Sequence, residues 1–151
     1  MSTSQSNHKS VSVNTVALLV AADVNEDAVP SIVAKLEQQG LTPDTCTLIM
    51  GDLDSDMAVG MPMLEQGYQM NKIIPTVWDD LETKPVAVGT RKDGSKFNRA
   101  APAVRNNQAI ALADVVLCVY PKDTEFAAVR QAWRMGKKVM VVKVETVEEQ
   151  M

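Results

Sequence analysis

Two long apolar stretches, residues 13–22 and 114–120, most constrain how this chain can fold. Both are rich in valine and leucine and almost free of charged side chains. Strands that are buried on both faces of a parallel sheet have this near-continuous apolar character. Shorter apolar stretches predict three further strands, at residues 46–50, 72–77 and 138–144.

Segments with helical periodicity separate these strands. Apolar side chains recur at helical spacing in residues 28–36, 57–70, 99–112 and 124–135. The alternation of strands and helices predicts an α/β, Rossmann-like three-layer sandwich with a mostly parallel sheet of about five strands. Residues 16–20 and 115–119 should form its central strands. Pro62 predicts that the second helix starts late or kinks.

One stretch, residues 78–98, interrupts the alternation. It contains Pro85, Gly89 and Gly94, and apolar and polar residues alternate on both sides of the pair Asp93–Gly94. Asp-Gly between alternating segments is typical of a hairpin turn. We therefore predict an inserted loop that carries a small hairpin.

Length and charge limit the class of protein. The 151 residues suffice for one domain, which we place at 13–145 between a disordered polar leader, 1–12, and a frayed tail, 146–151. A net charge of −4 provides no field for non-specific binding of nucleic acid. The absence of a long apolar run or signal segment predicts a cytoplasmic protein without a membrane span.

The reactive side chains are few. Cys46 and Cys118 each lie in an apolar run, where a thiol behaves as a small buried hydrophobe. The only histidine, His8, lies in the polar leader. This composition argues against a zinc site and against histidine-based catalysis, and we expect neither a metal nor a cofactor.

The C-terminal half carries a recognisable pattern. Trp78 is followed by FNRAAPAVRNNQAIALADVVLCVYP, then by Thr124, Ala132 and GKKV. This order resembles the YspA-like branch of the SLOG superfamily. The resemblance implies a Rossmann-like fold that binds a nucleotide or a nucleotide-derived small molecule. It also implies that Arg105 and Asn106 face the ligand crevice, and that Asp56 matches an aspartate that ends a turn in the family.

Each candidate ligand-binding residue has an ordinary structural alternative. Arginine offers a planar fork of donors for phosphate or carboxylate, and asparagine offers a donor and an acceptor for a base or sugar. Lys122 and Thr124 follow the fourth main strand, where open α/β sheets bind ligands, although Thr124 could instead cap a helix. The candidate residues are Arg105, Asn106, Thr124, Lys122, Asp56, Trp78 and Arg99.

Asp56, Trp78 and Arg99 could each have a role in ligand binding or in local structure. Asp56 could accept from a ribose or an amine, or simply stabilise the first turn of its helix. Trp78 could stack on a base. Arg99 belongs to a basic cluster that could close over an anion or form a solvated hairpin tip; its other members are Arg91, Lys92 and Lys96.

The helix around Arg105 allows a more specific expectation. Val104, Ala111 and Leu112 should face the core, with Arg105 on a neighbouring stripe that borders the sheet edge. On that placement, truncating Arg105 should abolish ligand binding and cost little stability.

The chain also departs from the pattern it resembles. Asp52 and Asp54 occupy a turn where glycines would hold a phosphate, so orthophosphate and ATP should bind weakly. Related N-glycosidic enzymes place a glutamate where this chain has Ala127 and Ala128, and Glu125 is the nearest substitute.

We therefore expect a binding module (a sensor, carrier or sequestering protein), rather than an enzyme, and a homo-oligomer. The alternatives are an N-glycosidic-bond hydrolase acting on nucleotides and a protein-interaction domain that has lost ligand binding.

Overall fold

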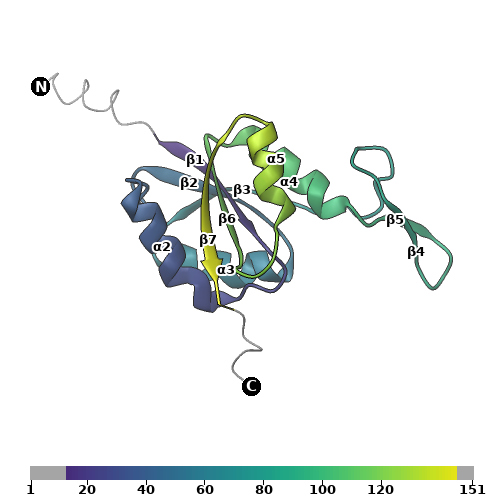
Figure 1. The fold of residues 1–151 in the computed structure, drawn as a ribbon, viewed down its shortest axis with the longest axis horizontal. Helices are drawn as coiled ribbons and strands as arrows, with labels where there is room; N and C mark the ends of the chain where they lie inside the picture. The colour runs from purple at the N-terminus through teal and green to yellow at the C-terminus, as the bar shows by residue number, and fades with distance from the viewer. Residues whose placement is uncertain (1–12, 146–151) are drawn as a thin grey trace, which may run out of the picture.

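The computed structural model describes residues 13–145, so the predicted leader, with His8, and the predicted tail lie outside the described residues. A five-stranded sheet forms the centre, in the order β3-β2-β1-β6-β7, with all neighbouring strands parallel (Figure 1). Its strands are β1 (Asn14–Val20), β2 (Cys46–Gly51), β3 (Gln69–Ile74), β6 (Val115–Pro121) and β7 (Lys138–Val144).

Helices cover both faces of this sheet, which confirms the Rossmann-like three-layer sandwich. On one face, α2 (Val29–Gln38) follows the short 3-10 helix η1 (Glu26–Ala28) and packs beside α3 (Asp54–Glu65). The other face carries α4 (Ala101–Leu112) and α5 (Ala127–Arg134), which also contact each other. No helix among residues 13–145 is long and apolar enough to cross a membrane.

Strand β1 shows why the apolar runs determine this architecture. Val16 and Leu18 point into the core on the α2–α3 face, whereas Ala17 and Leu19 point into the core on the α4–α5 face. All four side chains are buried. Because both faces of β1 exclude water, an alternating pattern would have placed polar groups in one of the two cores. The central position predicted for this strand is confirmed.

The structure corrects two boundaries near Pro62. Helix α3 begins at Asp54 instead of residue 57, because the Asp56 carboxylate accepts the Leu53 N–H at 3.0 Å and so caps an earlier turn. Pro62 lies inside α3 rather than delaying its start. Strand β3 then begins at Gln69 and ends before Pro75, three residues earlier at each end than the predicted 72–77.

Helix α4 faces the core differently from our expectation. Ala111 is exposed and Leu112 is 53% exposed, whereas Arg105 and Ala109 are buried. The helix is rich in alanine, and alanines leave the apolar stripe poorly marked in the sequence. The prediction that Ala111 and Leu112 belong to the core is therefore wrong.

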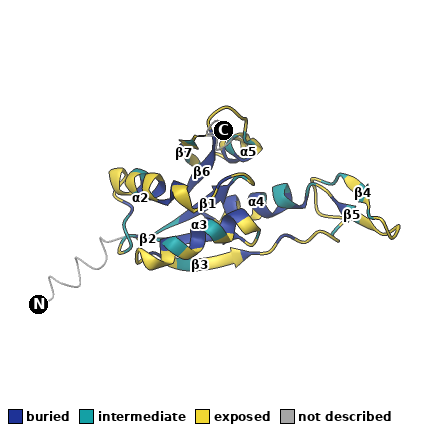
Figure 2. Cartoon of the chain, turned by 90° about the horizontal axis from the view of Figure 1, so that it is seen from below, coloured by how far each residue is buried: buried dark blue, intermediate teal, exposed yellow. Residues whose placement is uncertain are grey.

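The predicted hairpin is present and projects from the sandwich (Figures 1 and 2). Strands β4 (Val88–Thr90) and β5 (Lys96–Asn98) pair antiparallel, and Gly94 takes a φ of 90° in the turn between them. Its base is held by Asn98, whose side chain is 0% exposed. The Asn98 Oδ1 accepts from the N–H groups of Ala87 and Ala100, at 2.8 and 2.9 Å, and its Nδ2 donates to the Pro85 carbonyl at 3.0 Å.

Candidate functional site

Three of the predicted site residues meet at the carboxyl end of β2. Arg105 of α4 donates from Nη1 to Oδ2 of Asp56 in α3 at 2.8 Å, and from Nε to Oδ1 of Asn106 at 2.9 Å. Arg105 is 4% exposed and Asp56 is 2% exposed, and Asn106 is also buried. We call Asp56, Arg105 and Asn106 the carboxylate cluster. It joins a helix on one face of the sheet to a helix on the other.

Gly51, the last residue of β2, makes this meeting possible. A Cβ built on Gly51 would lie 1.6 Å from Nη1 of Arg105 and 2.6 Å from Oδ2 of Asp56. The guanidinium therefore occupies the space that any other residue would fill with its side chain. Sequence reasoning missed Gly51, although a lone glycine at the end of a buried strand is a signal of close approach.

The carboxylate of Asp56 retains unused hydrogen-bonding capacity. Its Oδ2 accepts from Arg105 and from the Leu53 N–H, whereas its buried Oδ1 has no partner within residues 13–145. Burial raises the pKa of Asp56, and the proximity of Arg105 and the Leu53 hydrogen bond offset only part of that rise. Asp52 adds to the rise through charge repulsion. A buried acceptor without a donor is costly, so this atom is suited to receive one from a bound molecule.

Asp56 lines a small cavity of about 40 Å³. The other walls are mostly apolar and come from β2, α3 and β3; they include Met50, Met57, Met61 and Ile73. A cavity of this volume admits a water-sized group, such as a hydroxyl or an amino group at the tip of a larger molecule. Methionine walls are unusually adaptable in shape.

Asp52 has a different role from Asp56. Its Oδ1 accepts the N–H of Thr76 at 3.0 Å, so it joins the loop after β2 to the segment after β3. Asp52 and Asp54 are both exposed. The carboxyl end of β2 therefore carries acidic groups next to the carboxylate cluster, and this charge opposes an incoming phosphate.

The two predicted residues after β6 lie in the turn that leads to α5. Thr124 donates from Oγ1 to the Pro121 carbonyl at 2.9 Å, and Lys122 contacts the carboxylate of Glu145 at 3.1 Å. Glu125 is exposed and precedes α5, while Ala128 is buried within it. Thr124 thus uses its hydroxyl to close the turn.

Trp78 and Arg99 lie before and after the two hairpin strands and contact the hairpin region. The centres of the Trp78 and Phe97 rings are 6.4 Å apart. The backbone carbonyl of Trp78 accepts the Asn98 N–H at 2.7 Å. Arg99 is exposed, and its N–H donates to the Ala87 carbonyl at 2.7 Å. All of these contacts are within the hairpin region rather than with the carboxylate cluster.

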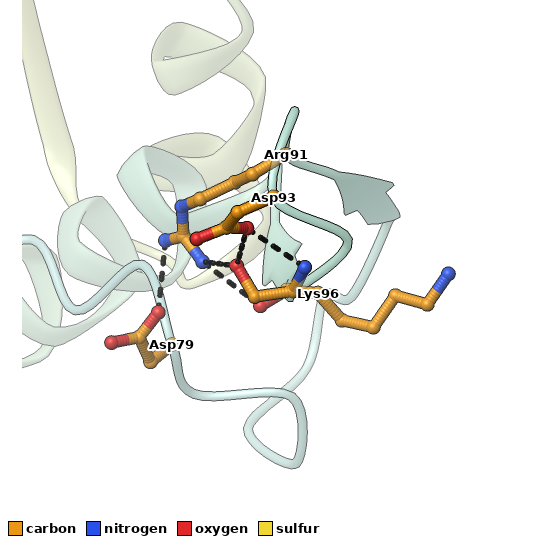
Figure 3. Close-up of polar contacts among 5 residues, drawn as sticks. Asp79, Arg91, Asp93 and Lys96 are labelled. Carbon is orange, nitrogen blue, oxygen red and sulfur yellow. Dashed lines mark hydrogen bonds and ion pairs between the residues drawn. The ribbon is translucent and has the colours of Figure 1, made fainter.

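The basic cluster of the hairpin is organised around Arg91 (Figure 3). Its guanidinium pairs with Asp79 at 2.8 Å and donates to the Lys96 carbonyl at 3.1 Å. It also lies 5.0 Å from the centre of the Phe97 ring. These contacts hold the hairpin to the segment before it, so Arg91 serves the local structure.

Within residues 13–145, no group of three histidine, cysteine, aspartate or glutamate side chains gathers as a metal site would require. Comparisons of the chain with family models, with curated proteins and with solved structures found no match. The resemblance to the SLOG superfamily stays a prediction, and the function has to be inferred from the geometry of this chain.

Proposed function

We propose that this protein binds a nucleotide-derived small molecule at the carboxyl end of its sheet, and that Asp56 is the main acceptor for it. The observation that carries the proposal is the buried Oδ1 of Asp56, which has no partner within the described residues. Open α/β sheets bind their ligands at this edge. Arg105 supports the site by holding the carboxylate, and Asn106 supports it indirectly by accepting a hydrogen bond from Arg105.

The chemistry of the site favours the donor-bearing part of such a ligand. A ribose hydroxyl or an exocyclic amine can donate to a carboxylate oxygen, whereas a phosphate brings only acceptors and negative charge. Asp52 and Asp54 are exposed beside the cluster and would repel a phosphate. We therefore expect nucleosides to bind at least as well as the corresponding nucleotides, and orthophosphate to bind weakly.

The test compares two matched carboxylate variants. Purified wild-type protein, Asp56→Asn and Asp54→Asn are denatured, and the small molecules that they release are identified by mass spectrometry. We expect a nucleotide-derived compound from the wild type and from Asp54→Asn, and a strongly reduced amount from Asp56→Asn. Circular dichroism verifies that all three proteins are folded.

Two outcomes contradict the proposal. If folded Asp56→Asn retains the compound, the carboxylate cluster is not the site. If the wild type releases no compound and calorimetry detects no binding of adenosine, guanosine, cytidine or uridine, the protein is not a nucleoside-type binder.

An apolar surface supports a second candidate, self-association. Met57, Met61 and Leu64 of α3 and Ile73 of β3 are all exposed. Strand β3 is an edge of the sheet, so its open backbone can pair with the same strand of a second copy about a two-fold axis. Light scattering during gel filtration tests this candidate: the wild type should be a dimer that Met61→Glu dissociates.

A further inference from the structure

A second, larger cavity lies away from the carboxylate cluster. It has a volume of about 860 Å³, is open to solvent, and is lined by side chains of the 81–86 segment before the hairpin, of α4 and of the C-terminal part of the chain around α5. Asn107 of α4 lines it, whereas Arg105, two residues earlier, reaches Gly51 at the edge of the sheet. Two residues along a helix correspond to a rotation of roughly 200°. The two sites therefore use opposite sides of α4.

Two amide side chains lie in the wall of this cavity in a defined orientation. Gln131 of α5 donates from Nε2 to the Ala103 carbonyl at 3.0 Å and to Oδ1 of Asn107 at 2.8 Å. The Ala103 carbonyl can only accept, so it determines which end of the Gln131 amide faces it, and this in turn orients Asn107. We call Asn107 and Gln131 the amide pair.

The amide pair keeps one donor and one acceptor unused. Asn107 Nδ2 and Gln131 Oε1 have no hydrogen-bond partner within residues 13–145. Both atoms are at least partly exposed to solvent, since neither is among the buried, unpartnered side-chain atoms of residues 13–145, and both residues line the cavity. Asn107 Nδ2 can donate to a carbonyl of a bound molecule, and Gln131 Oε1 can accept from an N–H of it.

The remaining walls suit a flat heterocycle with a negative charge. Leu81, Pro85 and Met135 provide apolar surface. Lys84 and Arg134 outnumber Glu82 among the charged side chains of the cavity. A volume of this size is within the range of cavities that hold small organic ligands.

We propose that this cavity is a second binding site, for a nucleoside monophosphate. The amide pair bonds the N–H and carbonyl at the edge of the base, which is the pattern that asparagine and glutamine read in nucleobases. The apolar side chains cover the faces of the base, and Lys84 and Arg134 attract the phosphate. This site differs from the carboxylate cluster, where acidic residues repel a phosphate.

The test titrates uridine and guanosine monophosphates into the full chain by calorimetry. Asn107→Asp keeps the oxygen that accepts from Gln131 but removes the Nδ2 donor, so affinity should fall at least about tenfold. Gln108→Glu adds the same charge at the exposed neighbouring residue and should bind like the wild type. The N3-methylated uridine monophosphate, which lacks the base N–H, should also bind at least about tenfold more weakly.

Two further variants separate the parts of the proposal. Arg134→Gln should weaken uridine monophosphate more than uridine, since only the former carries the phosphate. Asp56→Asn should leave the affinity of this cavity for uridine monophosphate unchanged, whereas any binding of uridine at the carboxylate cluster should be weakened; this difference distinguishes the two sites. Wild-type protein that binds neither monophosphate at millimolar concentration overturns the proposal, and so does folded Asn107→Asp that binds as tightly as the wild type.

Discussion

Replacing Arg105 by methionine should lower the free energy of unfolding by about 3–5 kcal/mol, the usual cost of removing one partner from a buried ion pair. Methionine is similar in length but carries no charge. Asp56, 2% exposed, would keep only the Leu53 N–H as a partner among the residues that the structure describes. The sequence led us to expect a small loss of stability, as for an exposed arginine. The structure shows instead that the Arg105 side chain is 4% exposed. Urea unfolding followed by circular dichroism measures the difference at constant m-value.

The pH dependence of this loss identifies its cause. Burial raises the pKa of Asp56 in the folded protein. The stabilisation that comes from this raised pKa is therefore complete at pH values below the ordinary pKa of an aspartate, and it is lost as the pH rises through the pKa of Asp56 in the folded protein. Removing Arg105 takes away the charge that opposes this rise. The loss should therefore be smaller at about pH 5 than at about pH 7, because protonation removes the uncompensated charge.

A double variant completes the test. Asp56→Leu combined with Arg105→Met removes both charges and should recover most of the stability, since a buried pair can often be replaced by apolar groups without loss. A cost of Arg105→Met below about 1 kcal/mol, the range of an exposed arginine, would contradict a stabilising buried ion pair between Asp56 and Arg105. A loss that is equal at the two pH values and equal in the Asp56→Leu background would attribute the effect to packing alone.

Three other changes should have measurable results. Gly51→Ala should destabilise the protein at least as much as Arg105→Met, because the new Cβ would lie 1.6 Å from Nη1 of Arg105. If the Gly51→Ala variant is as stable in urea as the wild type, the guanidinium does not occupy this position. Asn98→Ala should accelerate tryptic cleavage in the hairpin, since the buried side chain makes three hydrogen bonds at its base; an unchanged rate would contradict this role. Burial raises the pKa of Cys46 to about 11 and that of Cys118 to about 12, so neither thiol should react with Ellman's reagent at about pH 8 until urea is added.

The parts of the fold that the sequence predicted well are those where burial leaves a strong local pattern. Strand β7 spans the predicted residues 138–144, and β1 and β6 agree with their apolar runs. Asp93–Gly94 marked the hairpin because a hairpin turn of this kind has few compatible residues. Strand β3 was misplaced because it is an edge strand with mostly exposed side chains, so its residues carry little apolar signal.

The candidate site was predictable only in part. Arg105, Asn106 and Asp56 do meet, but Asp56 and Arg105 are 49 residues apart and their bond depends on the space at Gly51. The amide pair was missed for a similar reason: Asn107 and Gln131 are 24 residues apart on different helices. Polar residues on alanine-rich helices are ordinary in sequence, and only the packing of α4 against α5 gives these two a common orientation.

The bond between Asp56 and Arg105 also has a mechanical consequence. It connects the first turn of α3 to α4 at the end of the sheet, so the two helical layers are joined directly as well as through the strands between them. Helix α4 follows β5 directly, and Asn98 holds the base of the hairpin to the N–H of Ala100. The Asp56–Arg105 bond and the Asn98–Ala100 bond therefore connect α3, α4 and the base of the projecting hairpin through side chains as well as through the backbone.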